Sequence, residues 1–404
     1  MPEYTAWITE QIRKVCETYK KRTAGSASVR SAMRYMAGQL QAWSDSVKET
    51  SFTFHPHAFI ASMGVHVFCD ICATFCFVLS VLLPSRLLAF ASPLFFMTAL
   101  LAAVFQYILY DRLFDPLYPK REGINILAVR KAKKTAKQRI IFCGHADAAF
   151  EMPVFLRPKM AWAVYLLTLL ANIGLLMGLT TGVLNLLITI SAQTLKSLAI
   201  AEVCFLPFYI PFFFFVRWNV VADGANDNLT GCYLSMSILK KMADEDIRLD
   251  HTDVCCLITD GEESGLRGAM AYAETNKDEL LDTNSIIIAV DTIRETDQLA
   301  VYHRGINFTQ KNDPAVCELL HRAGLACGID LPYAKFYPGA SDAEAFSRNG
   351  IPAAAICAVR HSTVSYYHTR KDSWDNLDTD CIEATQQILW NAAELLDKET
   401  ETGI

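Results

Sequence analysis

The sequence has no excess of basic charge. Its 404 residues include 37 Lys and Arg against 43 Asp and Glu, which gives a formal net charge of −6 at pH 7. Proteins that bind nucleic acids usually gather positive charge on the surface that meets the phosphate backbone. The charge balance therefore argues against a nucleic acid as a partner.

Charged residues of either sign are also scarce. They make up 20% of the chain, whereas 52% of its residues are hydrophobic and its mean hydropathy is +0.21. This composition is apolar for a wholly soluble protein, so we expect part of the chain in a lipid bilayer. The first 50 residues lack the pattern of a secretory signal peptide and have that of polar amphipathic helices. Membrane entry would then use internal segments.

The 13 cysteines do not form the pattern of a disulfide framework. Several lie inside apolar runs, unlike the cysteines of small secreted domains. We expect reduced and mostly buried thiols, and we interpret the adjacent Cys255 and Cys256 as core residues rather than as a redox pair.

Four apolar stretches are long enough to span a bilayer. Only short turns, near residues 84–86 and 191–196, separate the partners of each pair, so the stretches form two hairpins. Each hairpin would enter and leave the membrane on the same side, and all the polar segments would share that side. Buried helices of a soluble enzyme are the alternative, but apolar runs of this length seldom occur in soluble domains. The stretches are 59–83, 87–110, 164–190 and 198–216.

The distribution of basic residues predicts the orientation. Lys and Arg gather in the polar segments before the first hairpin and between the two hairpins, whereas each far turn carries a single basic residue, Arg86 or Lys196. By the positive-inside rule, the polar domain is predicted at the cytoplasmic face of the membrane.

Two ionisable residues interrupt the first apolar stretch. His66 and Asp70 are four positions apart and would share one face of a helix. Ionisable side chains are costly in hydrocarbon, so we expect the two to pair and to face protein. A role in a proton relay is a weaker alternative, which Glu202 in the fourth stretch would have to continue.

The polar remainder predicts one α/β domain with a central, mixed and largely parallel sheet flanked by helices, because strand-like and helical patterns alternate along it. Strands are expected near 124–129, 140–143, 254–259, 286–290 and 353–359, and helices near 6–19, 28–43, 229–242, 268–274, 315–326 and 382–396. The expected division is 1–57 for the N-terminal helices, 58–110 for the first hairpin, 111–160 for the first part of the sheet, 161–217 for the second hairpin and 218–404 for the rest of the domain.

Acidic and histidine residues follow several expected strands, where open α/β sheets place their active sites. Gly144-His145-Ala146-Asp147 comes directly after the run 140–143, and its carboxylate can orient its imidazole. Asp291 closes a very apolar run, where a carboxylate needs a partner or a metal. Taken singly, the segment 144–147 can also be an ordinary polar loop, and Asp291 can also be a helix cap.

Three more segments have similar chemistry. Asp227 lies in the Gly- and Asn-rich turn GANDNLTG, where it can bridge two cations or cap a helix. Glu262 and Glu263 in TDGEESGLRG can divide proton transfer and metal binding between them, or form a solvated turn. His368 lies in YYHTRKDSWDNLD, where a lone histidine is more often structural.

The ordered set of segments resembles the co-catalytic zinc exopeptidase family, which includes bacterial leucyl aminopeptidases and, more distantly, glutamate carboxypeptidase and glutaminyl cyclase. GHAD, GANDNLTG, TDGEESGLRG, the strand-terminal aspartate, SDAEAF with NGIPA, and YYHTRKDSWDNLD occur in the family's order, and RTAGS near the N-terminus is similar to its first segment. The resemblance covers most of the polar chain and none of the hairpins.

The resemblance implies a site for two zinc ions. One ion would be held by His145, Asp227 and Asp291, and the other by Asp227, Glu263 and His368, with Asp227 as the bridge. Zinc accepts imidazole and carboxylate ligands and keeps a position open for water at catalytic sites.

The resemblance also implies roles for two further carboxylates. Glu262 would be the general base and Asp147 the partner that orients His145. The family's bridging aspartate precedes a cis peptide bond, so we expect one at Asp227-Asn228.

These residues predict a membrane-embedded zinc exopeptidase, and an aminopeptidase in the first place. A carboxypeptidase or an amidohydrolase acting on small acylated amino acids is the alternative, and a catalytically inactive membrane receptor is less favoured because no ligand is lost. Glutaminyl cyclisation is also less favoured, since that branch is expected to use one zinc and to lack a counterpart of His145. The second hairpin is inserted between His145 and Asp227, which predicts an active site close to the bilayer surface. A peptide or small amide would be the substrate, and the sequence does not indicate an oligomeric state.

Overall fold

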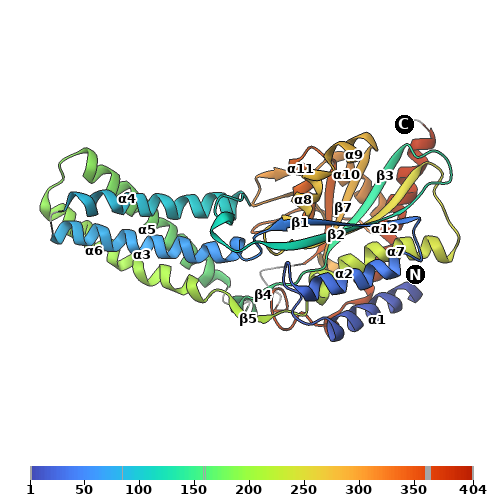
Figure 1. Ribbon diagram of the computed structural model, residues 1–404, viewed down its shortest axis with the longest axis horizontal. Helices are drawn as coiled ribbons and strands as arrows, with labels where there is room; N and C mark the ends of the chain where they lie inside the picture. Colours follow the sequence, from blue (N-terminus) through green and yellow to red (C-terminus); the bar gives the residue numbers. More distant parts are fainter. Residues whose placement is uncertain (1, 84, 158, 160, 360–364, 403–404) are drawn as a thin grey trace. The chain divides into compact units, whose positions relative to one another are not determined.

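The computed structural model describes residues 2–83, 85–157, 159, 161–359 and 365–402 (Figure 1). The chain divides into two compact units. Unit 1 comprises Met1–Pro56, Lys120–Glu151 and Trp218–Ile404, and unit 2 comprises His57–Pro119 and Met152–Arg217.

Unit 1 is built around one mixed sheet. Its strands lie in the order β1-β2-β6-β3-β7-β11-β8-β10, and β9 pairs with β8. The central strands β6, β3, β7 and β11 are parallel, so their carboxyl ends share one edge of the sheet. The fold class predicted from the sequence is thereby confirmed. The strands are β1 (Ser46–Phe54), β2 (Arg121–Arg130), β3 (Gln138–His145), β6 (Thr252–Thr259), β7 (Ser285–Ile293), β8 (Leu299–Gly305), β9 (Gln310–Lys311), β10 (Tyr333–Lys335) and β11 (Ala353–Ala358).

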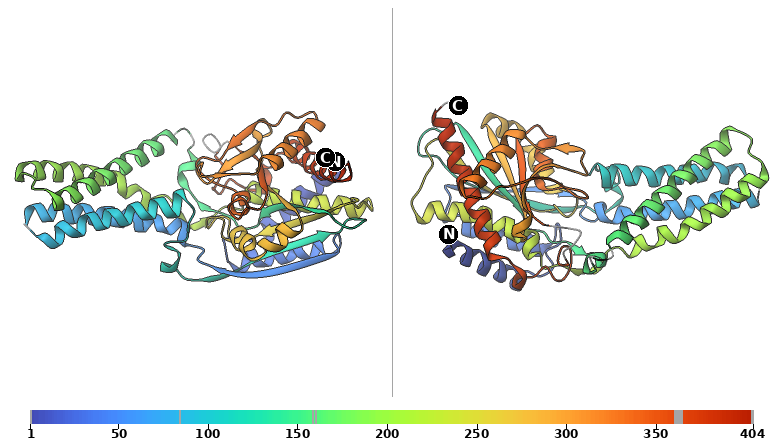
Figure 2. Two further views of the ribbon diagram at one scale, coloured as in Figure 1. Left: turned by 90° about the horizontal axis from the view of Figure 1, so that it is seen from above. Right: turned by 180° about the vertical axis from the view of Figure 1, so that it is seen from behind.

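Helices cover both faces of this sheet (Figures 1 and 2). On one face, alternate strand residues such as Ile140 and Phe142 of β3 and Val290 of β7 join residues of five helices in one buried core, as the two-residue period of a strand requires. On the other face, Cys143 of β3 donates to Asp342 at the start of α11. The helices of unit 1 are α1 (Pro2–Thr18), α2 (Ala27–Leu40), α7 (Thr230–Asp244), α8 (Arg267–Thr275), α9 (Lys277–Asp282), α10 (Pro314–Ala326), α11 (Asp342–Arg348) and α12 (Thr379–Thr402).

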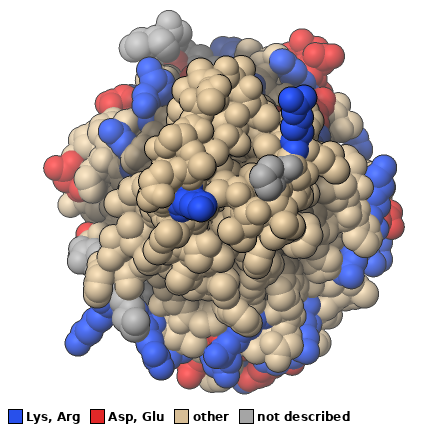
Figure 3. Space-filling model, turned by 90° about the vertical axis from the view of Figure 1, so that its left-hand side faces the viewer, with Lys and Arg blue, Asp and Glu red and all other residues tan. Residues whose placement is uncertain are grey.

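Unit 2 consists of two helical hairpins. Among the described residues, four of its helices are long and apolar enough to cross a membrane. Their outer surface is apolar, with Leu87, Leu187 and Phe214 each more than 70% exposed, and the tips of the hairpins present an almost uncharged surface (Figure 3). Pro84, expected in the first far turn, lies outside the described residues. The helices are α3 (Ala58–Leu82), α4 (Arg86–Leu101) continued by the π-helical turn Ala102–Ile108, α5 (Ala161–Leu187), and α6 (Ala192–Tyr209) continued by the 3₁₀ turn Ile210–Phe214.

Candidate metal centre

The structure brings the seven predicted site residues together at the carboxyl edge of the parallel strands. His145 ends β3, Asp291 lies near the end of β7, and Glu262 and Glu263 lie in the turn after β6. Asp227 lies in the irregular turn Ala225–Leu229 before α7. His368 comes from the loop between β11 and α12. The ligand atoms fall into two groups, each within 4.8 Å: His145, Glu262 and Asp291, and Asp227, Glu263 and His368.

His145 presents one ring nitrogen to the carboxylates. Its Nε2 lies 3.3 Å from Asp227 Oδ1, 3.7 Å from Glu262 Oε2 and 3.9 Å from Asp291 Oδ1. Its Nδ1 lies 3.2 Å from the backbone oxygen of Asp147, which can only accept a hydrogen bond. The proton of a neutral His145 therefore sits on Nδ1, and Nε2 is left as a lone-pair donor for a metal.

Asp227 lies between the two histidines. Its Oδ1 faces His145, and its Oδ2 lies 3.1 Å from His368 Nε2, which is itself 3.4 Å from Glu263 Oε2. One carboxylate thus contributes an oxygen to each group, which is the geometry of a bridging ligand. The peptide bond Asp227-Asn228 is cis, as the resemblance implied.

Asp147 does more than orient His145. Its carboxylate accepts the backbone N–H groups of Gly261, Glu262 and Glu263 at 2.9, 3.2 and 3.1 Å, whereas its Oδ1 lies 3.6 Å from His145 Nδ1. The main structural effect of this buried carboxylate is therefore to hold the turn that carries both glutamates.

Asn228 and Asp372 fix the position of Asp227. The Asn228 side chain donates to Val290 O at 2.8 Å and accepts from Gly231 N at 3.0 Å, which ties the turn to β7 and α7. The Asp372 carboxylate accepts the backbone N–H of Asn226 at 2.7 Å and that of Asp227 at 3.1 Å.

Three residues that the sequence analysis did not single out support this arrangement. Besides Asp372, Arg22 is buried and donates to the backbone oxygens of Ala146 and Asp223, so it connects two ligand-bearing loops. Asp342 accepts from Thr259 at 2.5 Å, close enough to Glu262 to affect its charge. Arg22, Asp342 and Asp372 do lie inside the quoted RTAGS, SDAEAF and YYHTRKDSWDNLD segments, but their partners come from distant segments.

The site concentrates negative charge. Burial raises the pKa of Glu262 well above its usual range, and Asp291, Asp342 and Asp227 add to that shift against the effect of His145. Burial, Asp227 and Glu262 likewise raise the pKa of Glu263. Burial also raises the pKa of Asp291, to about 7, although His145 opposes it. Burial, reinforced by the neighbouring carboxylates, thus favours the protonated forms of Glu262, Glu263 and Asp291.

Two other groups of the site, His145 and Asp227, instead favour their charged forms. Burial lowers the pKa of His145, but Glu262, Asp147, Asp227 and Asp291 outweigh it and raise that pKa well above the usual range. Burial raises the pKa of Asp227, but the nearby imidazoles of His145 and His368 lower it below its usual range. The cluster thus favours any added positive charge.

The donor set fits zinc. Imidazole nitrogens and carboxylate oxygens are its common protein ligands. Among the described residues, the buried atoms His145 Nε2 and Glu263 Oε1 have no hydrogen-bond partner, which is costly unless something else satisfies them. The excess of carboxylates supplies the charge that would hold divalent cations.

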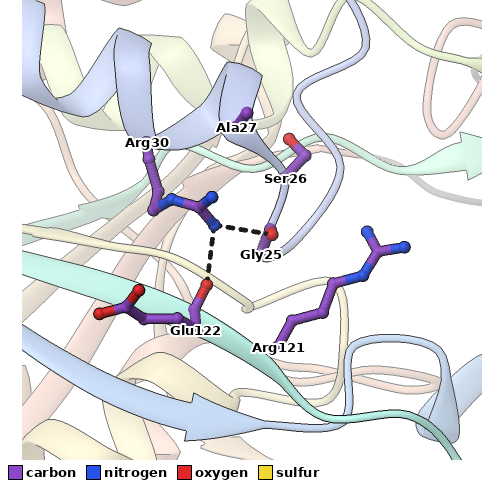
Figure 4. A pocket seen from close by; sticks show the side chains of 6 residues that line it. All are labelled: Gly25, Ser26, Ala27, Arg30, Arg121 and Glu122. Carbon is purple, nitrogen blue, oxygen red and sulfur yellow. Dashed lines mark hydrogen bonds between the residues drawn. The ribbon is translucent and has the colours of Figure 1, made fainter.

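A separate pocket of unit 1 lacks this chemistry. It is lined by residues at the start of α2 and β2, and its Arg30 donates to the backbone oxygens of Gly25 and Glu122 (Figure 4). None of the residues of the metal centre lines it, so it is not part of the site.

Known proteins share this fold. Residues 212–393 match the model of peptidase family M28. An aminopeptidase from Aneurinibacillus sp. strain AM-1 is 15% identical, with a TM-score of 0.56 over 96% of this chain and 93% of that one. BSAP, a zinc aminopeptidase from Bacillus subtilis, is 12% identical, with a TM-score of 0.55 over 96% and 94%. The glutaminyl cyclase of Porphyromonas gingivalis is 11% identical, with a TM-score of 0.57 over 97% and 98%. No curated protein sequence matches this chain significantly.

Proposed function

We propose that this chain is a two-zinc aminopeptidase of peptidase family M28, whose model matches residues 212–393. The position of Asp227 carries the proposal, because its two carboxylate oxygens face two different histidines, 3.3 and 3.1 Å away. His145 and Asp291 would complete one zinc site, and Glu263 and His368 the other. A peptide with a free N-terminus would be the substrate.

Bound zinc would supply the Lewis acidity that acidifies a water and polarises the scissile carbonyl. Glu262 would take the proton of the attacking water and pass it to the leaving amine. Asp147 would keep Glu262 in place through the backbone of the 261–263 turn.

Zinc content and hydrolysis, measured on the same samples, test this function. Purified full-length protein loaded with zinc is expected to release the first residue from aminoacyl amides and dipeptides. Glu262→Gln should lower kcat about 100-fold to 10,000-fold while two zinc ions per chain are retained. Ligand atoms of Glu262, His145 and Asp291 lie within 4.8 Å of one another. If Glu262→Gln loses zinc, Glu262 is therefore a zinc ligand instead. No hydrolysis by the wild-type protein of any free-amine substrate would refute the aminopeptidase.

N-acylated substrates distinguish the alternatives within hydrolysis. A carboxypeptidase or an amidohydrolase would cleave acetylated dipeptides or acylated amino acids and would ignore substrates that lack a free carboxylate. An inactive receptor would cleave none of these, with or without zinc.

The likeness to glutaminyl cyclases makes cyclisation the second candidate. The fold does not separate the two reactions, but the number of zinc ions and the products do. A peptide with N-terminal glutamine would lose ammonia in a cyclase and a whole residue in an aminopeptidase, and mass spectrometry distinguishes these outcomes. His145 and Asp291 form half of the two-ion site and favour hydrolysis.

We also propose that the helices of unit 2 span a bilayer, with unit 1 at its cytoplasmic face. Their length, their apolar outer surfaces and the basic segments that flank them support this arrangement. Because the second hairpin is inserted between His145 and Asp227, the peptide would be cleaved near the membrane surface. Glycosylation acceptor sequences inserted into the 191–196 turn, and separately after residue 311, test the orientation during translation into microsomes. We expect modification of the first variant only, and modification of the second would reverse the orientation.

A further inference from the structure

We propose that unit 2 contains a second functional site, a proton-binding site formed by Asp70, Glu202 and Tyr209 and supported by His66. It lies inside the four apolar helices and shares no residue with the metal centre. It does not depend on the peptidase activity. The proposal rests on three buried side chains whose polar atoms converge, and on the hydrogen-bond geometry of the histidine beside them.

We infer a proton between His66 and Asp70, because among the described residues neither side-chain oxygen of Asp70 has a hydrogen-bond partner. His66 Nδ1 is 2.9 Å from the backbone oxygen of Ala99 in α4, and a carbonyl oxygen can only accept, so Nδ1 carries a hydrogen. His66 Nε2 is 3.2 Å from Asp70 Oδ2. Either a neutral imidazole accepts from a protonated Asp70 or an imidazolium donates to a carboxylate. In both states the pair holds one proton at this contact, and the aspartate is fully buried.

Glu202 of α6 brings a second carboxyl group to Asp70. The two groups are close enough to interact electrostatically. Glu202 is fully buried, and among the described residues neither of its side-chain oxygens has a hydrogen-bond partner. A bare carboxylate in hydrocarbon is costly, and it has to be neutralised by a proton or by another cation.

Tyr209 points its hydroxyl into the same cluster. It lies two turns after Glu202 on α6, so both residues share one helix face. Its side chain is fully buried, and its hydroxyl interacts electrostatically with both carboxyl groups. Within the part of the chain that the structure describes, this hydroxyl also lacks a hydrogen-bond partner.

Small residues of α5 make room for these groups. A Cβ atom at Gly174 would lie 2.4 Å from the Tyr209 hydroxyl, and one at Gly178 would lie 3.0 Å from Glu202 Oε1 and 2.3 Å from Phe96. The two glycines are four residues apart, on one face of α5, which allows the helices to approach closely. Glu202 and Tyr209 of α6 therefore pack against glycines of α5, which have no side chain to hydrogen-bond with them.

Among the described residues of the four helices, no Lys or Arg side chain is buried with the acids to neutralise them. Arg86 and Lys196 lie at the far turns and are exposed, and His66 already shares its proton with Asp70. The other titratable side chains of these four helices are thiols and phenols, namely Cys69, Cys72 and Cys76 on α3, Tyr107 after α4, Tyr165 on α5 and Cys204 on α6. None of them can supply a positive charge.

A proton suits this site better than a sodium ion. Hard metal cations usually take about six oxygen ligands, and membrane transporters often obtain some of them from unwound helices. Here α3 and α5 are continuous through the site, whereas α6 contains Pro207 between Glu202 and Tyr209. The three described acidic and phenolic side chains offer the oxygens of two carboxyl groups and one hydroxyl, which is fewer than about six. A proton needs two oxygens, or one oxygen and one imidazole nitrogen.

Infrared spectroscopy of the zinc-loaded, full-length protein in lipid nanodiscs tests the site. We expect a carbonyl band of a protonated carboxyl group that persists above the pH at which exposed acids ionise and is lost at alkaline pH. Asp70→Asn and Glu202→Gln should each remove part of this band, whereas Glu10→Gln on the exposed face of α1 should leave it unchanged. His66→Gln should shift the Asp70 component and leave the Glu202 component in place.

Three results would overturn the proposal. A band that neither Asp70→Asn nor Glu202→Gln affects would mean that both acids are ionised. A band that persists unchanged from about pH 5 to about pH 9 would indicate a static polar contact without proton exchange. A midpoint that moves with sodium chloride but not with choline chloride would identify sodium as the ligand.

Carbodiimide labelling gives a measurement that needs no variant. Dicyclohexylcarbodiimide adds to protonated carboxyl groups in apolar surroundings, and mass spectrometry of the unmodified chain would locate the adduct. We expect it at Asp70 or Glu202, at a rate that falls about tenfold for each pH unit above half-protonation. Labelling confined to other residues, together with an absent infrared band, would refute the site even if the variants failed to fold.

Discussion

The carboxylate of Asp372 accepts the backbone N–H of Asp227 at 3.1 Å. Asp372 belongs to the loop that also carries His368, so the histidine that faces Asp227 and the carboxylate that holds its backbone come from one segment. Asp372 is fully buried, and burial raises its pKa to about 7, although hydrogen bonds from Asn226 and Asp227 oppose this shift. The two oxygens of Asp372 hold the backbone of Asn226 and Asp227 in place. In this position the carboxylate of Asp227 faces both His145 and His368.

Asp372→Ala is therefore expected to weaken zinc binding without removing a ligand. Loss of a residue that positions a metal ligand commonly costs 10-fold to 100-fold in metal affinity, and we expect a decrease of that size. Competition with a chromogenic chelator measures it. Asp375→Ala, in the same loop but bonded to Ser373, is the matched control and should bind zinc as the wild type does. Equal zinc affinity in Asp372→Ala and the control would contradict the role assigned to Asp372.

The bridging position of Asp227 predicts a distinct change in metal content. Asp227→Ala should lower zinc from two ions per chain to less than one, because both groups lose a ligand. Glu263→Ala removes a ligand from one group only and should leave about one ion. Elemental analysis of dialysed protein counts the ions. The same loss in both variants would mean that Asp227 serves a single ion, and no loss in either would refute the ligand set.

The candidate site was predictable because its proposed ligands lie at or near the ends of strands that the apolar pattern reveals. His145 ends β3 and Asp291 lies near the end of β7, strands that the sequence placed within a few residues, and a parallel arrangement brings such ends to one edge. The four long apolar helices of unit 2 were equally clear, since apolar runs of this length are easily recognised in a sequence.

Other features depend on contacts between distant segments and were not predicted. β1 (Ser46–Phe54) has a polar, half-exposed sequence, and its strand conformation comes from pairing with β2 at the edge of the sheet. Asp372 reads in sequence as one more polar residue of a loop, and only the fold brings it to the backbone of Asp227. The sequence offered Glu202 only as the continuation of a relay from Asp70, because hydropathy does not specify that α3 and α6 are neighbours.

Gly231 is expected to tolerate no side chain. It lies in the first turn of α7, and a Cβ atom there would be 2.0 Å from the backbone oxygen of Val290 and 2.4 Å from Asn228 Oδ1. Gly231→Ala should destabilise unit 1 by about 1–3 kcal/mol or more, since the backbone of β7 would have to move. Gly38→Ala, in an exposed part of α2 with no atom within 4 Å of the new Cβ, is the control and should stabilise by about 0.5–1 kcal/mol. Thermal unfolding compares the two variants, and an unchanged melting temperature for Gly231→Ala would show that this turn is not close-packed.

Asp45 should make stability depend on pH at the acidic end. Arg248 donates to both of its oxygens at 2.7 and 2.8 Å, and this hydrogen bonding lowers the pKa of Asp45 from 3.8 to about 2. A carboxylate whose pKa is lower in the folded state contributes stability above the unfolded pKa, and the contribution is lost as the pH falls through about 2. The two side chains are still about one third exposed to solvent, so the contribution should not exceed about 1 kcal/mol. Asp45→Asn should therefore lower the melting temperature at pH 6, and its difference from the wild type should shrink as the pH approaches about 3. Exposed Asp282→Asn provides the baseline at each pH, and a difference for Asp45→Asn that grows on acidification would reverse the assigned sign.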